Sequence, residues 1–168
     1  MAISSQPGLI LSPQQYADTP VYELLYAASR GHAGVDRRWL RAILDRGPDA
    51  VPDLLRFADE PHEDDLVILE EELIAMFRHL RVREAVPYLV GIIRDEPDSV
   101  PDDVVEALIE IGEAAVQPLL DLYEELDAED NDVPFILASL GIRHPRILDI
   151  LVDRLAYDPV DAAICLGI

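Results

Sequence analysis

The chain has 168 residues, half of them hydrophobic, and a formal net charge of −21. A disordered chain combines high charge with low hydrophobicity, and only the high charge is found here. The composition therefore predicts a folded domain or a short repeat array. Aromatic residues make up only 6% of the chain, and the largely aliphatic remainder favours interdigitated helices.

The amino terminus and the single cysteine, Cys165, indicate the compartment. Residues 1–7 have neither the basic segment nor the apolar core of a signal peptide. Every uncharged apolar run is far shorter than the roughly 18 residues that a membrane span needs. Because one cysteine cannot form an intramolecular disulfide, a reducing compartment suits the chain. We therefore expect a cytoplasmic protein that has no membrane segment.

The acidic residues are concentrated in one stretch of the sequence. Residues 95–142 hold 15 aspartates and glutamates and no basic residue, whereas residues 1–94 and 143–168 have net charges of −5 and −1. All 13 basic residues of the chain are arginines. An acidic surface repels phosphate backbones, so the charge argues against direct nucleic-acid binding.

Helical periodicity accounts for most of the chain. Residues 1–12 are predicted as an irregular arm and residues 20–30 as the first amphipathic helix. Apolar residues with the i, i+3, i+4 spacing of such a helix then recur in four further segments. These segments are residues 36–46, 64–80, 102–111 and 132–140. No long run alternates with period two, so strands are not expected.

Capping signals mark the ends of these helices. Gly47, Gly112 and Gly141 each follow a predicted helix, where a residue without Cβ most easily adopts a left-handed C-cap. Ser99 precedes Asp102 by three residues, with a proline between them, and this spacing predicts a capping box at the next helix start.

A second helical motif follows each of the four later segments. It reads Ala50-Val-Pro-Asp-Leu-Leu55, Ala85-Val-Pro-Tyr-Leu-Val90, Ala115-Val-Gln-Pro-Leu-Leu120 and Ile147-Leu-Asp-Ile-Leu-Val152. The leading leucines of the aliphatic pairs lie 35, 30 and 32 residues apart, namely Leu54, Leu89, Leu119 and Leu151. This spacing predicts repeated helix pairs. The prolines at 52, 87 and 118 fall in the first turn of a second helix, where a missing N–H costs little.

These pairs resemble HEAT repeats, and in particular the short HEAT-like repeats first described in phycobilisome lyases. The string Ile111-Gly-Glu-Ala-Ala-Val-Gln-Pro-Leu-Leu120 carries the closest resemblance, which extends over residues 35–168. The signature residues of tetratricopeptide and ankyrin repeats are absent. The resemblance implies an all-α fold, an α-α superhelix in which second helices line a concave face, and a scaffold that holds another protein. It transfers no functional residue, because the repeat motif is structural.

We expect a single HEAT-like domain over residues 1–168. Its predicted parts are an arm (1–12), an amino-terminal capping helix (13–34), four repeats and an incomplete final repeat (158–168). The four repeats span about residues 35–62, 63–97, 98–130 and 131–157. The last apolar residues either continue into a longer array or dock against a partner, such as a second copy of the chain that forms a homodimer through the carboxyl-terminal helix.

Candidate catalytic and metal groups do not converge. The dipeptide His62-Glu63 resembles the His-Glu pairs that bind iron in deoxyhypusine hydroxylase, a HEAT-like metalloenzyme. It has no second copy here, so the ligand count fails. Residues 70–72 are three glutamates that point about 100° apart on a helix, which is typical of a solvated face. Cys165 lies among apolar residues and is interpreted as a buried thiol. We therefore predict no enzyme activity, no catalytic residue, no metal site and no cofactor.

The aromatic residues lie at helical spacing among aliphatic ones and are predicted to pack in the core. They include Trp39, Phe57, Phe77, Tyr88, Tyr123 and Phe135. Bilin lyases of this repeat class leave open an alternative function, a HEAT-like lyase or a metal- or chromophore-handling enzyme.

The acidic stretch gives the best prediction of a binding surface. On the helix expected from residue 113 to 127, the apolar face is formed by Val116, Leu119, Leu120, Tyr123 and Leu126. Asp121, Glu124 and Glu125 must then project elsewhere, and nothing basic lies near them in sequence. Such a surface attracts a cationic partner in a salt-dependent way, although solubility alone is an alternative reason for it. We expect a noncatalytic scaffold whose protein partner has a basic surface and contacts these three residues.

Overall fold

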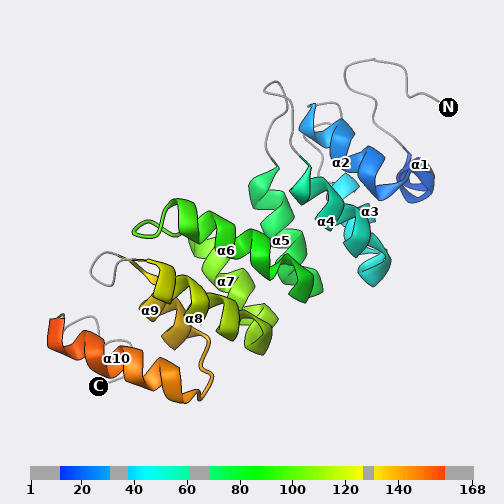
Figure 1. The fold of residues 1–168 in the computed structure, drawn as a ribbon. Helices are drawn as coiled ribbons and strands as arrows, with labels where there is room; N and C mark the ends of the chain where they lie inside the picture. The colour runs from blue at the N-terminus through cyan, green and yellow to red at the C-terminus, as the bar shows by residue number, and fades with distance from the viewer. Residues whose placement is uncertain (1–11, 31–37, 61–68, 127–130, 158–168) are drawn as a thin grey trace. The chain divides into compact units, whose positions relative to one another are not determined.

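All regular secondary structure in the described part of the chain is helical (Figure 1). The computed structural model describes residues 12–30, 38–60, 69–126 and 131–157. No β-strand occurs in these ranges, so the all-α prediction is confirmed. The chain divides into two compact units, Met1–Leu80 and Arg81–Ile168, and each is described by itself.

The first unit is built from short helices. They are α1 (Pro13–Asp18), α2 (Val21–Ser29), α3 (Arg38–Leu44), α4 (Val51–Asp59) and α5 (Glu70–Leu80). The prediction of one capping helix over residues 13–34 is wrong, because α1 ends before Pro20 and α2 begins after it. α1 begins with a reciprocal capping box, in which the hydroxyl of Ser12 accepts from the backbone N–H of Gln15 and the Gln15 side chain accepts from the backbone N–H of Ser12. α1 packs against α3, α2 against α3 and α4, and α3 against α5.

The Arg46 side chain connects the residues that follow α3 to the end of α1. The Arg46 guanidinium donates to the carbonyl oxygens of Tyr16 (2.9 Å) and Ala17 (3.1 Å), at the end of α1, and to that of Thr19. These carbonyls have no intrahelical partner, because the last turn of a helix leaves its C=O groups free. The arginine therefore closes the carboxyl end of α1.

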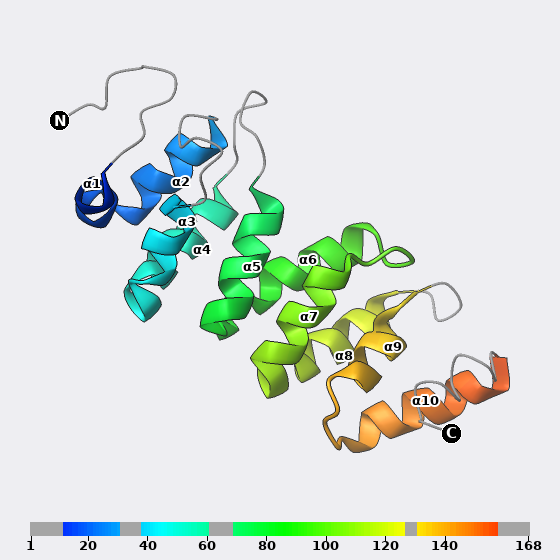
Figure 2. The same cartoon turned by 180° about the vertical axis from the view of Figure 1, so that it is seen from behind.

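The second unit continues the same pattern of short helices. They are α6 (Val86–Asp95), α7 (Asp102–Ile111), α8 (Val116–Glu125), α9 (Val133–Ser139) and α10 (Pro145–Tyr157). α6 packs against α7 and α8, α8 against α9, and α9 against α10. Figure 2 shows α6 to α10 from behind, in the same order. The bounds of α7 are those that the sequence predicts, and α9 is one residue shorter at each end.

One structural module occurs three times in the described residues. A 3-10 turn leads into an α-helix at Gly47–Ala50, Arg83–Ala85 and Gly112–Ala115, ahead of α4, α6 and α8. The alanine that ends each turn and the leucine four residues later are fully buried: Ala50, Ala85, Ala115, Leu54, Leu89 and Leu119. A small residue at the turn lets the backbones approach closely, and the leucine fills the core behind it. These are three of the four motifs that the sequence aligns, and the fourth, residues 147–152, lies within α10 without such a turn.

The three glycines have the predicted positive φ, between 57° and 78° at Gly47, Gly112 and Gly141, although the ψ of −131° at Gly112 is not that of a left-handed helical cap. The prolines lie in the first turns of α4, α6 and α8 as predicted. The capping-box prediction at Ser99 is wrong. α7 begins after Pro101 without a side-chain hydrogen bond at its N-cap. The proline disfavours a helical conformation at the residue before it, so the helix starts too late for Ser99 to cap it.

Candidate interaction surfaces

The three predicted contact residues lie on the exposed side of α8. Asp121, Glu124 and Glu125 are all exposed. The opposite side is buried and consists of Val116, Leu119, Leu120 and Leu122. Tyr123 and Leu126, which the sequence interpretation placed in this face, are only half-buried. α8 therefore separates an apolar face from an acidic one, with the buried face rotated slightly from the predicted position.

Arginines from other helices pair with two of the three carboxylates. Arg146 of α10 lies 2.7 Å from a carboxylate oxygen of Glu124, and Arg94 of α6 lies 2.9 Å from one of Glu125. Asp121 accepts a hydrogen bond of 2.7 Å from the side-chain amide of Gln117. The sequence shows no basic residue near these acids, because both arginines are more than twenty residues away along the chain.

These ion pairs leave the surface acidic but lower its local charge. All four paired side chains are largely exposed, so each pair stabilises the fold by about 0–1 kcal/mol and is weakened by salt. The donor to Asp121 is the neutral amide of Gln117, which does not offset the negative charge of the aspartate. Other members of the acidic stretch are also exposed: Asp95, Glu96, Asp98, Asp102, Glu106, Glu110 and Glu113. Of these, Glu110 pairs with Arg81 at 2.7 Å.

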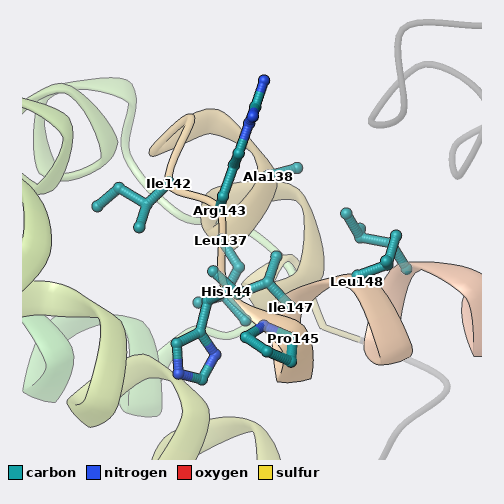
Figure 3. Close-up of a pocket in the computed structure, with 9 residues that line it drawn as sticks. Leu137, Ala138, Ile142, Arg143, His144, Pro145, Ile147 and Leu148 are labelled. Carbon is teal, nitrogen blue, oxygen red and sulfur yellow. The ribbon is translucent and has the colours of Figure 1, made fainter.

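A second surface feature is a pocket between α9 and α10, which sequence reasoning did not locate. Its volume is about 540 Å³ (Figure 3). Its walls are mainly apolar and comprise Leu137, Ala138, Ile142, Arg143, His144, Pro145, Ile147, Leu148 and Leu151. The Nδ1 atom of His144 is buried and has no hydrogen-bond partner among the described residues.

Large apolar side chains are exposed on the two helices that form this pocket. Phe135 of α9 is 51% exposed, and Leu148 and Val152 of α10 are 56% and 51% exposed. The prediction that the aromatic residues pack in the core is confirmed for Trp39, Phe57 and Phe77, which are buried, and wrong for Phe135, while Tyr88 and Tyr123 are half-buried. α9 directs Val133, Ile136 and Leu137 inward, and Phe135 projects to nearly the opposite side of the helix.

The candidate chemical groups do not form a site in the described residues. His62 and Cys165 lie outside those residues. Of the three glutamates predicted to form a solvated face, Glu71 is exposed and Glu70 and Glu72 are half-buried in the first turn of α5, where acids are favoured by the helix dipole. Within the described ranges, no three His, Cys, Asp or Glu side chains are grouped as metal ligands would be. No helix of the described chain has both the length and the apolarity needed to cross a membrane.

Comparisons with protein-family models, with curated proteins and with solved structures gave no match.

Proposed function

We propose that the chain is a noncatalytic scaffold of the HEAT-like type, an α-α solenoid that binds a protein partner through an acidic surface. The observation that carries the proposal is the module that recurs ahead of α4, α6 and α8, with its turn alanine and core leucine fully buried each time. Stacked helix pairs of this kind typically provide extended surfaces for holding other proteins. A cytoplasmic location suits such a scaffold.

The charge indicates what kind of partner fits. Residues 81–168 hold 20 acidic residues and 6 arginines, a net charge of −14. Such a field accelerates association with a basic protein surface and opposes association with nucleic acid. We assign the contact to Asp121, Glu124 and Glu125, which are exposed on one helix. A basic partner would compete there with Arg94 and Arg146, so its binding is expected to depend strongly on salt.

The test is a pull-down with the intact chain at about 0.05 M and about 0.5 M NaCl, a range in which screening becomes much stronger. The comparison is between the wild type and a triple variant, Asp121→Asn, Glu124→Gln and Glu125→Gln. We expect a basic protein to be retained by the wild type at low salt, released at high salt, and retained poorly by the triple variant at either concentration.

A matched control changes the net charge equally at exposed acids of the first unit: Glu23→Gln, Asp49→Asn and Asp59→Asn. The control should retain the partner as the wild type does. If both triple variants lose the partner equally, net charge alone drives binding and α8 is not the contact. If no protein is retained at low salt, the scaffold proposal loses its support.

A further inference from the structure

The chain itself supplies a cation to two of the three carboxylates assigned to the partner contact. The Arg94 guanidinium of α6 donates to Oε2 of Glu125 through Nε (3.2 Å) and through a terminal nitrogen (2.9 Å). Arg146 of α10 donates to Oε1 of Glu124 at 2.7 Å. The donor to Asp121 is a neutral side-chain amide. In the free protein, helices that come before and after α8 in the chain therefore compensate two of its three charges.

Arg146 occupies a position that its own helix does not explain. It directly follows Pro145, the first residue of α10, and the first turn of a helix favours anions rather than cations. Arg94, in contrast, lies in the last turn of α6, where the helix dipole favours a cation. The pair of Arg146 with Glu124 is exposed, and such pairs add little to stability. Its larger consequence is the charge that it offsets on α8.

Pairing with these arginines and binding of a basic partner oppose each other at the same carboxylates. A guanidinium in contact with a carboxylate offsets its charge, and a second cation at that carboxylate is repelled by the resident arginine. All four paired side chains are at least half exposed, so solvent reaches both pairs and either arginine can move away. The surface therefore has a paired state, in which two charges are offset, and an open state with three negative charges on one helix.

We propose that Arg94 and Arg146 form an autoinhibitory latch on the acidic surface of α8. They neutralise Glu124 and Glu125 in the free protein, and the cations of a basic partner must displace them. A single cation that replaces one arginine gains little, because one ion pair is exchanged for another. A segment with several arginines or lysines displaces both latch residues and also gains Asp121, so the latch selects partners of high local charge. This inference rests on the proposed function and describes the regulation of the same site.

The experiment measures the binding of a fluorescently labelled oligoarginine peptide to the intact chain. Binding is followed by fluorescence anisotropy at about 0.05 M NaCl, where charges are weakly screened. The latch variant is Arg94→Gln, Arg146→Gln, which keeps a polar side chain at both positions. We expect it to bind the peptide at least about threefold more tightly than the wild type, because two exposed ion pairs no longer have to be broken.

The matched control is Arg83→Gln, Arg143→Gln, which changes the net charge equally at two other exposed arginines of the second unit. It should raise the affinity by a smaller factor than the latch variant does. A further comparison introduces the latch substitutions into the triple variant Asp121→Asn, Glu124→Gln, Glu125→Gln. There they should raise the affinity no more than the control substitutions do, because the carboxylates that the latch covers are gone.

Three results would overturn the latch. Equal affinities of the latch variant and its control would show that the gain follows net charge alone. An unchanged affinity of the latch variant with a lower melting temperature would make both arginines structural links between helices. Binding of the peptide to neither the wild type nor the latch variant would show that the surface does not take up cations.

The failure of the latch can be distinguished from the failure of the proposed function. If the triple variant loses the peptide but the latch variant binds it like the control, only the latch is wrong. If the triple variant binds the peptide as well as the wild type does, the acidic contact on α8 is wrong, and the latch fails with it.

Discussion

The two units use their arginines in different ways. In the first unit, Arg41 and Arg56 pair with acids four residues ahead, Asp45 and Glu60, each of which directly follows the helix of its arginine, and Arg46 binds backbone carbonyls. In the second unit, three ion pairs join residues 22 to 31 positions apart: Arg81–Glu110, Arg94–Glu125 and Arg146–Glu124. These ion pairs of the first unit therefore each lie within one helix and the residue after it, whereas those of the second unit connect different helices.

The cores of the two units also differ. Trp39, Phe57 and Phe77 are buried in the first unit, whereas the buried hydrophobic residues described in the second unit are all aliphatic. The second unit also has twice the net charge, −14 against −7 for residues 1–80. Aromatic side chains therefore add to an aliphatic core in the first unit, whereas the described core of the second is aliphatic alone and opposes stronger self-repulsion.

The largest expected effect comes from removing an aromatic side chain from the first core. Phe57 is 1% exposed and packs edge-to-face on Tyr22, with ring centroids 5.8 Å apart. Phe57→Ala leaves a cavity and should lower the free energy of unfolding by about 3–5 kcal/mol. Urea unfolding followed by the fluorescence of Trp39, the chain's single tryptophan, measures this loss in the first unit.

Phe135→Ala is the matched control, because it makes the same substitution at an exposed position of the second unit. It should change the free energy of unfolding, measured by circular dichroism, by no more than about 0.5 kcal/mol. A loss as large as that of Phe57→Ala would mean that Phe135 is buried, and the contrast between the two cores would not hold.

A smaller effect tests the use of arginine in the first unit. Arg46→Ala leaves the terminal carbonyls of α1 without their charged donor and should cost about 1–2 kcal/mol. Arg41→Ala breaks only an exposed pair within α3 and its following turn, worth about 0.3–0.5 kcal/mol. Thermal unfolding of both variants measures the difference. Equal losses would show that Arg46 contributes no more than a surface ion pair.

The sequence was sufficient to predict local features of this fold. Helix periodicity located most helices, and Gly47, Gly112 and Gly141 marked turns because positive φ is easiest for glycine. Arg81 has a φ of 50° in the corresponding place after α5, and nothing in its side chain predicts this. Contacts between residues far apart in the sequence could not be predicted either. Contacts such as Arg94–Glu125 depend on how helices pack, which composition and periodicity do not encode.

The candidate surfaces were predictable to different degrees. The exposure of Asp121, Glu124 and Glu125 follows from the apolar face of their helix, but their pairing with arginines does not. The exposed apolar side chains of α10 have a sequence signal, because Leu148 and Val152 align with Val116 and Leu120. That alignment predicts a packing surface. It does not show whether a later helix covers the surface, which depends on the tertiary structure.

The smallest expected effect concerns Tyr22, whose hydroxyl donates a hydrogen bond to the Glu60 carboxylate. This bond, followed by burial and the charge of Glu60, raises the pKa of Tyr22 above the ordinary tyrosine value of 10.0. Because the folded state holds the proton more tightly, the resulting stability is fully present below about pH 10 and is lost as the pH rises through the folded pKa.

The stability of the wild type relative to the Tyr22→Phe variant should therefore fall only in alkaline solution, since phenylalanine does not titrate. Urea unfolding from pH 7 to pH 11 or so measures this, with absorbance titration of the six tyrosines as a second readout. A stability difference between the two proteins that is the same at every pH would contradict the pKa shift and leave Tyr22 with its hydrogen bond to Glu60 and its packing on Phe57.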